Sequence, residues 1–280
     1  MKLINKAIAV VKITRPLNLL ITFFSIIVGS AICITGNYIL HKIILAAVSG
    51  ALISASGNII NDIFDIEIDK INQPDRVLVK GGLKKNEAVI IYLLFAYSGI
   101  FISSFINYQA IIISTSVSVL LYLYSFKLKR IVLAGNFIIA VITGMAFIYG
   151  GAAVQNIGPS IIPALFAFLI NFIREIIKDM EDIEGDTKTG VKTFPFKYGF
   201  GVSKKMIIIF SMVLILFTFY PFVLKIYGFK YLIIILAVVD PLLIYFLRSL
   251  IGDDSRKNLN KLSFILKLNM VFGLIAIILG

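Results

Sequence analysis

The stretch KMIIIFSMVLILFTFYPFVL, residues 205–224, decides the fold class of this chain. It holds one charged residue, Lys205, in a run about as long as the helix that crosses the hydrocarbon core of a bilayer. Unpaired backbone groups are costly in lipid, and the run is continuous rather than alternating, so it predicts a helix and not a barrel strand. Similar runs predict nine spanning helices in all, at residues 17–36, 42–60, 87–106, 109–126, 131–152, 159–178, 205–224, 230–250 and 262–279.

The composition of the chain also indicates a lipid environment. Its 280 residues are 59% hydrophobic and 15% charged, with a mean hydropathy of +0.99. A soluble domain is about half apolar and about a quarter charged. The sequence therefore predicts an all-α, polytopic membrane protein that forms a single domain over residues 1–280. Its single cysteine, Cys33, excludes a disulfide within the chain.

The basic residues indicate the orientation of these helices. The N-terminal segment and the even-numbered connections, with the helix ends that border them, hold 24 of the 27 Lys and Arg residues. Only Lys42, Lys225 and Lys230 fall on the other side. The positive-inside rule then places the N-terminus in the cytoplasm and the chain in the cell membrane. A basic face beside anionic lipid accounts for the net charge of +12, so nucleic acid is not an expected partner.

Two short acidic windows, residues 61–75 and 175–186, hold 11 of the 15 Asp and Glu residues, and both lie on the predicted cytoplasmic side. A shift of 117 residues overlays the two windows. The residues that match are Asp62, Asp65, Ile66, Glu67 and Asp69 with Asp179, Asp182, Ile183, Glu184 and Asp186. Each copy ends an even-numbered helix, so we predict an internal pseudo-repeat of helices 1–4 and 5–8, with the two motifs facing each other across a shared cavity.

The spacing within each motif indicates a metal site. On a continuous helix Asn61, Asp65 and Asp69 share one face, as do Asp182 and Asp186. Like charges at this spacing repel, which favours a bound cation, and hard oxygen ligands favour Mg²⁺. Mg²⁺ takes few protein carboxylates and completes its shell with water and phosphate oxygens. Two such rows of carboxylates, one from each motif, therefore fit a diphosphate that is bridged by metal ions. The alternative is a solvated acidic loop, or pairing of the acids with neighbouring Lys and Arg.

The motif Asn61-Asp62-x-x-Asp65-x-x-x-Asp69, with the later Asp182-x-x-x-Asp186, resembles the paired signatures of the UbiA family of intramembrane prenyltransferases. Other segments similar to that family are Arg15-Pro16-x-Asn18, Asn72-x-Pro74-x-Arg76 and Gly190-x-Lys192-Thr193. The resemblance implies nine helices around a central cavity, Mg²⁺ and a diphosphate under the two motifs, and a side opening for lipid substrates. One departure is Leu128, which stands where the family often has Lys four residues after Tyr124; Lys127 and Lys129 are the possible substitutes.

Within the family, residues 174–186 look most like the archaeal enzymes that act on geranylgeranylglyceryl phosphate. The resemblance implies Mg²⁺-dependent transfer of a geranylgeranyl group from geranylgeranyl diphosphate to the free hydroxyl of that lipid, with release of pyrophosphate. The expected metal ligands are Asn61, Asp65, Asp69, Asp182 and Asp186, and Asp62 or Asp179 is the expected proton acceptor. The expected substrate-binding residues are Arg15, Asn18, Asn58, Arg76, Tyr124, Lys127, Lys129, Arg130, Arg174 and Lys178.

Three other functions fit parts of the pattern. Prenylation of an aromatic acceptor, such as homogentisate, hydroxybenzoate or dihydroxynaphthoate, would use the same two motifs. A CDP-alcohol phosphotransferase also has membrane-embedded Asp clusters, but in one motif with a Gly-Ala-Arg segment that this sequence lacks there. A divalent-cation transporter would carry its acids near the midplane, whereas these lie at one face.

Overall fold

The computed structural model describes residues 2–35 and 40–280, and within them it contains helices and no strand. In this part of the chain eight helices are long and apolar enough to cross a bilayer, and the bent pair at the N-terminus would make nine. The predicted all-helical, multi-pass fold is confirmed. The longer helices are α1 (Lys2–Ile13), α2 (Pro16–Ala31), α3 (Leu40–Phe64), α5 (Lys85–Ser103), α6 (Tyr108–Phe126), α7 (Ala134–Ala153), α8 (Ile161–Glu181), α10 (Phe194–Val223), α12 (Asp240–Gly252) and α13 (Arg256–Leu279).

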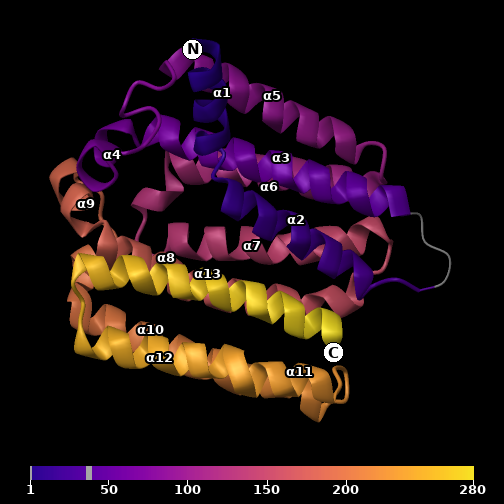
Figure 1. Cartoon of the computed structure of the whole chain (residues 1–280). Coiled ribbons are helices and arrows are strands. Elements are labelled where there is room, and N and C mark those ends of the chain that lie inside the picture. The colour runs from indigo at the N-terminus through magenta and orange to yellow at the C-terminus, as the bar shows by residue number, and fades with distance from the viewer. Residues whose placement is uncertain (1, 36–39) are drawn as a thin grey trace.

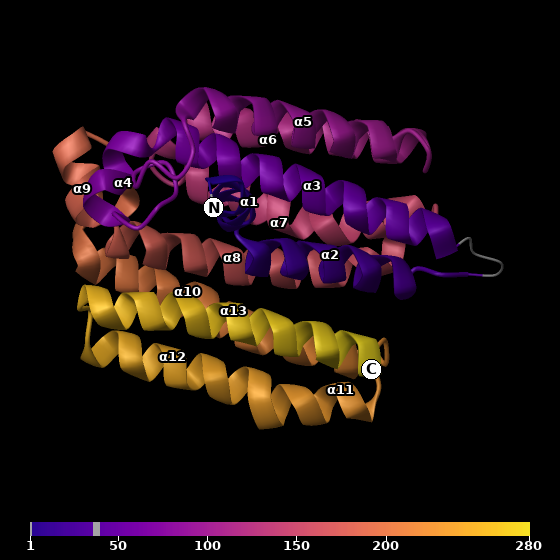
Figure 2. The ribbon, with the colours of Figure 1, turned by 45° about the horizontal axis from the view of Figure 1, so that its top comes forward.

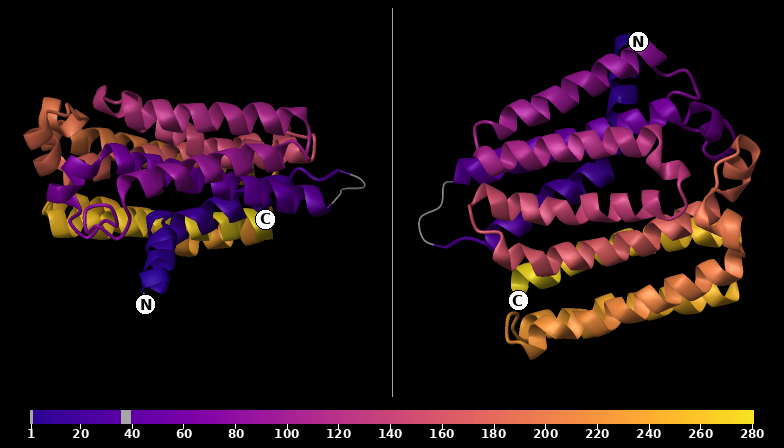
Figure 3. Two further views of the ribbon diagram at one scale, coloured as in Figure 1. Left: turned by 90° about the horizontal axis from the view of Figure 1, so that it is seen from above. Right: turned by 180° about the vertical axis from the view of Figure 1, so that it is seen from behind.

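The short elements join these spans and close one end of the bundle. They are α4 (Ile66–Asn72), η1 (Leu128–Arg130), η2 (Gly158–Ser160), α9 (Ile183–Thr189), α11 (Phe229–Ile234) and the π-helical turn η3 (Ile235–Val239). The spans run side by side, and α4 and α9 lie together at one end (Figure 1, Figure 2). Helix α1 meets α2 at an angle of 52° and points away from the bundle (Figure 3).

The predicted boundaries need two corrections, one in the first span and one in the acidic motifs. The first span ends at Ala31, and its predicted end at residue 36 lies outside the described residues. The span predicted at 230–250 is present as Phe229–Gly252. Within it the π-helical turn joins α11 to α12, because Pro241 has no N–H to donate and its ring crowds the preceding turn. Each acidic motif, predicted as one continuous helix, turns at its central aspartate, Asp65 or Asp182.

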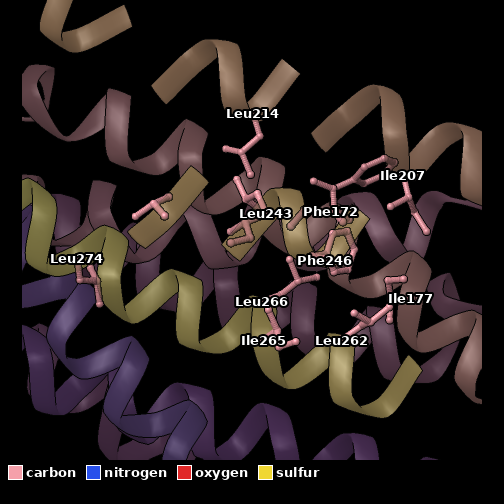
Figure 4. Packing of buried hydrophobic residues seen from close by; sticks show 14 of the residues in the cluster. Phe172, Ile177, Ile207, Leu214, Leu243, Phe246, Leu262, Ile265, Leu266 and Leu274 are labelled. Carbon is pink, nitrogen blue, oxygen red and sulfur yellow. The ribbon is translucent and has the colours of Figure 1, made fainter. Parts of the chain in front are cut away.

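Helices α2 and α7 pack against each other in the middle of the bundle. On one side are α3, α5 and α6, and on the other are α8, α10, α12 and α13 (Figure 1). The largest buried cluster lies in the second group, where Phe172, Leu243, Phe246 and Leu266 pack together (Figure 4). Large apolar side chains are exposed along α5, α6 and α10, which is the surface a lipid environment requires.

Small residues allow α2 and α7 to approach closely. A Cβ on Gly150 would lie 2.3 Å from the backbone oxygen of Ile26, and one on Gly29 would lie 2.6 Å from that of Phe147. Neither neighbour is the end of a flexible side chain, so the helices themselves would have to separate. This small-residue contact holds together the two helices that form the centre of the bundle.

We expect Gly150→Ala to destabilise the protein by about 1–3 kcal/mol, because the added methyl group overpacks the α2–α7 contact. The measurement is the thermal or denaturant unfolding midpoint of the purified protein in detergent. Gly201→Ala is the control, since a Cβ at that position meets nothing within 4 Å. Equal midpoints for the two variants would show that the contact tolerates a methyl group.

Candidate active site

A cavity of about 340 Å³ lies between α2, α3, α6, α7, α8 and α13. Its deeper walls are mainly aliphatic, and the aromatic side chains among the described residues that line it are Tyr124 and Tyr149. It extends to the end of the bundle where α4 and α9 meet, and we call this end of the cavity its mouth. The polar side chains that line it there include Asn61, Asp65, Asp69, Asp182 and Asp186. The two acidic motifs therefore share one cavity.

The two motifs have the same local structure. Asp65, between α3 and α4, has φ −98° and ψ 6°, and Asp182, between α8 and α9, has φ −95° and ψ 7°. Each is followed by a helix of seven residues. Hydrogen bonds from Asp69 N–H to the Asp65 carbonyl (2.8 Å) and from Asp186 N–H to the Asp182 carbonyl (3.2 Å) continue across both turns. Aspartate tolerates this break better than a strong helix former does, and the break folds each short helix over the cavity mouth.

Asn72, at the end of α4, connects the two motifs directly. Its side-chain N–H donates to the Asp182 carbonyl (2.8 Å), and its side-chain oxygen accepts from the Gly185 N–H (2.9 Å). Its own carbonyl accepts a hydrogen bond from Arg256 of α13. A Cβ on Gly185 would lie 2.4 Å from the Asn72 side-chain nitrogen, so the Asn72 side chain would have to move away from this contact. We call the contact between Asn72, Asp182 and Gly185 the Asn72 clasp.

The first motif is surrounded by cations. Asp62 is buried, does not line the cavity, and pairs with both Arg15 and Arg76. Arg15 has a left-handed conformation (φ 57°), which is unfavourable before proline and turns α1 away from α2. Lys129 contacts Asp65. The ion pairs of Asp62 hold the guanidinium groups of Arg15 and Arg76 at the cavity. The role of Asp62 as a proton acceptor stays a prediction.

The second motif includes the end of α8. Asp179 lines the cavity and accepts a hydrogen bond from Asn136 (2.8 Å). Lys178 pairs with Glu181 (2.8 Å) and with Asp182 (3.4 Å). The Asp182 Oδ1 atom is buried and has no hydrogen-bond partner among the described residues. An uncompensated carboxylate oxygen of this kind fits a divalent cation.

Burial changes the acid–base properties of both rows. The pKa of Asp69 is raised to about 6, mainly by burial and against the pull of Arg76. The pKa of Asp186 is raised to about 7, by burial and by the neighbouring charge of Asp182. Burial also lowers the pKa of Lys129 to about 8, with a further contribution from Arg130. Burial thus disfavours the charged forms of both carboxylates, and a bound cation would stabilise them.

The residues suit Mg²⁺ held jointly with a ligand. Within residues 2–35 and 40–280, no three acidic, His or Cys side chains converge closely enough to hold an ion alone. Mg²⁺ commonly takes one or two carboxylates and completes its shell with water and phosphate oxygens. Asn61, Asp65 and Asp69 on one side and Asp182 and Asp186 on the other match that requirement when a diphosphate lies between them.

The structure brings most of the predicted substrate-binding residues to the cavity. Those that line it are Arg15, Asn18, Asn58, Arg76, Tyr124, Lys129, Arg174 and Lys178. Lys127 and Arg130 are exposed and do not line it. Of the two possible substitutes for the lysine that the family often has after Tyr124, Lys129 is therefore the one at the site. The roles of all these residues stay predictions.

Several polar residues of the cavity are not predicted from the sequence. Lys267 belongs to the basic residues that the charge pattern places at helix ends, but it lies near the middle of α13 and lines the cavity. Asn136 and Asn171 also line it from within apolar helices. The available signal was a polar side chain inside an otherwise apolar run, which in a membrane helix marks a function or a partner.

Comparison with known proteins identifies relatives of the whole chain. The model of the UbiA prenyltransferase family matches residues 22–271. Digeranylgeranylglyceryl phosphate synthase of Methanocaldococcus jannaschii is 41% identical over 231 residues, which cover 81% of this chain and 80% of that protein. A structure from a study of digeranylgeranylglyceryl phosphate synthase in membranes has 37% identity and a TM-score of 0.76, and it covers 98% of each chain.

A more distant homologue shows the same fold. A UbiA homologue from Archaeoglobus fulgidus, solved with GPP and Mg²⁺ bound, has 21% identity and a TM-score of 0.67. The match covers 96% of this chain and 99% of that one.

Proposed function

The chain belongs to the UbiA prenyltransferase family, and from that premise we propose that it makes the second ether bond of an archaeal membrane lipid. In this reaction a geranylgeranyl group passes from geranylgeranyl diphosphate to the free hydroxyl of geranylgeranylglyceryl phosphate, and pyrophosphate leaves. The observation that supports this most is the pair of acidic motifs at one cavity that is lined by both polar and aliphatic side chains. Curated relatives named for this activity span nearly the whole chain.

We propose Mg²⁺ as the cofactor, held by Asn61, Asp65, Asp69, Asp182 and Asp186. When bound it supplies a Lewis acid that withdraws charge from the diphosphate. Lys129, at the first motif, and Arg76, beside it, supply further positive charge to the departing pyrophosphate. The bound metal and diphosphate of the Archaeoglobus fulgidus homologue support this assignment.

The rest of the cavity protects the reacting carbon. Breaking the bond between C1 and oxygen gives an allylic carbocation, which water would quench. Isoleucine, valine and leucine side chains on α3 and α6 keep the walls dry, and the faces of Tyr124 and Tyr149 can stabilise the cation. Of the two predicted proton acceptors only Asp179 lines the cavity, so we propose that it receives the acceptor's hydroxyl proton.

The arrangement in the membrane follows from the same features. We propose that the cavity mouth faces the cytoplasm, because the ends of the spans beside it carry most of the basic residues.

We also propose that helices 1–4 and 5–8 are a pseudo-repeat. The nearly equal backbone angles of Asp65 and Asp182 support the equivalence of the two halves.

The choice of acceptor is tested by competition. The purified protein, supplied with Mg²⁺ and geranylgeranyl diphosphate, should prenylate geranylgeranylglyceryl phosphate in preference to homogentisate, hydroxybenzoate or dihydroxynaphthoate. Mass spectrometry of the products identifies the new bond, and chelation of Mg²⁺ should abolish it. Prenylation of an aromatic ring alone would contradict the proposal.

A further inference from the structure

In the described part of the chain, Lys267 is a cation without a partner in the middle of a membrane helix. It is the twelfth residue of α13 and lines the cavity. None of the ion pairs and hydrogen bonds found among residues 2–35 and 40–280 includes its side chain. The charged groups with the strongest electrostatic influence on it are the cations Arg174, Arg15 and Lys178, followed by the acid Glu175. A charge at this depth is costly, so its presence in a cavity indicates an anionic ligand.

Arg174 of α8 is a second cation that lines the same cavity. Its Nη1 pairs with Glu175 (3.0 Å), but its Nε is buried and has no hydrogen-bond partner in the described chain. The two residues also lie at a similar depth. Helix α13 begins and α8 ends at the same end of the bundle (Figure 1), and Asn260 of α13 donates to Glu181 of α8 (2.8 Å). Lys267 and Arg174 each lie about two helical turns farther along these antiparallel helices, which brings them to one level.

A second, apolar pocket begins one helical turn below these two cations. Its lining includes Asn171 and Met270, which lie three residues from Arg174 and Lys267 and also line the main cavity. Farther in it is bounded by apolar side chains of α8, α10, α12 and α13, among them Leu214 and Leu243. Two cations at the entrance of an apolar pocket match an amphipathic lipid with an anionic head.

We propose that Lys267 and Arg174 bind the phosphate of the acceptor lipid and that the second pocket, with a volume of about 70 Å³, takes part of its isoprenoid chain. This rests on the proposed function, which needs two prenyl lipids in one cavity. The donor's diphosphate has its own place at the two motifs, where Arg76 and Lys129 pair with Asp69 and Asp65. The acceptor's phosphate could not lie against the carboxylates without repulsion, whereas Lys267 and Arg174 provide five or more unused N–H donors.

The first test separates the two substrates. We expect Lys267→Met to raise the KM for geranylgeranylglyceryl phosphate by about tenfold or more, because charged hydrogen bonds to a phosphate are lost. The KM for geranylgeranyl diphosphate should change by less than about twofold. Lys267→Arg should keep acceptor affinity. Lys261→Met is the control, since Lys261 is on the same helix but exposed beside Tyr245. An unchanged acceptor KM in Lys267→Met would overturn the proposal.

A second test removes the phosphate instead of the lysine. Geranylgeranylglycerol should be a poor acceptor for the wild-type enzyme, and Lys267→Met should lower its use no further. Such non-additive losses are expected when the two groups contact each other. Additive losses would show that Lys267 acts elsewhere.

A third test concerns the pocket. Gly273 lines it, and a Cβ there meets nothing within 4 Å, so the side chain in Gly273→Leu starts in open space and should enter the pocket. This variant should lose activity with geranylgeranylglyceryl phosphate but retain it with an acceptor that carries a single five-carbon prenyl group. A raised KM for geranylgeranyl diphosphate instead would assign the pocket to the donor and contradict the proposal.

Binding without the donor distinguishes failure of this inference from failure of the proposed function. Calorimetric titration of geranylgeranylglyceryl phosphate into the protein in nanodiscs should give weaker affinity for Lys267→Met than for wild type. Equal affinity would overturn the site even if the enzyme makes the expected product. Absence of that product from the wild-type protein would defeat the proposed function, whatever the titration shows.

Discussion

Asp65→Asn and Asp182→Asn should each lower the rate of Mg²⁺-dependent pyrophosphate release by roughly 10²- to 10³-fold, the loss expected when one preorganised charge contact to a transition state is removed. Each substitution keeps the shape of the side chain and removes its charge. Both residues line the cavity from a motif turn, so either loss should impair the shared metal and diphosphate. The concentration of Mg²⁺ needed for half-maximal rate should rise in both variants.

Matched controls come from the same motifs. Glu67 and Glu184 occupy equivalent positions in the two copies, but both are exposed and pair with Lys70 and Lys188. Glu67→Gln and Glu184→Gln should therefore keep nearly wild-type turnover. Full activity in Asp65→Asn and Asp182→Asn would show that the two motifs do not take part in the reaction.

Gly185→Ala should lower kcat/KM by about 10²-fold although it leaves every carboxylate in place. The added methyl group would occupy the position of the Asn72 side chain and break both hydrogen bonds of the Asn72 clasp. The two carboxylate rows would then separate, and a displacement of about 1 Å at reacting groups can cost that much. Steady-state kinetics with an unfolding measurement on the same sample distinguishes a misaligned site from an unfolded protein.

Two further variants test whether Asn72 and Gly185 act through the same contact. Thr187→Ala, on the same short helix and exposed, is the control and should have no such effect. Asn72→Ala should be as harmful as Gly185→Ala, and the double variant should be no worse than either, because all three lose the same contact. Independent, multiplying losses would mean that Asn72 and Gly185 do not act together.

The sequence predicts the fold well because the lipid solvent leaves few choices. Long apolar runs such as 205–224 can only be helices, and the charge pattern separates the two ends of the bundle. The duplicated Asp65 and Asp182 motifs predict two equivalent rows at one end, and the structure brings both rows to one cavity. These features depend on local periodicity and on the solvent, which a single sequence contains.

Other features of the site depend on contacts between distant segments. The turns at Asp65 and Asp182 interrupt a helix that periodicity alone predicts as continuous. Asn72 reaches Gly185 across 113 positions, and nothing local to either residue signals the other. The charge of Lys267 fits the positive-inside pattern, so the sequence predicts topology for it and gives no sign that its side chain lines the cavity. Tertiary packing decided each of these points.

The hydrogen bond from Arg256 to the Asn72 carbonyl has a consequence for biogenesis. Asn260 likewise donates to Glu181 (2.8 Å), so the start of the last span is attached to both halves of the molecule. A nascent chain that has inserted only its earlier spans lacks these attachments, and closing such distant loops is slow. We therefore expect the chain to become catalytically competent only at the end of synthesis, when α13 enters the bilayer and makes these contacts.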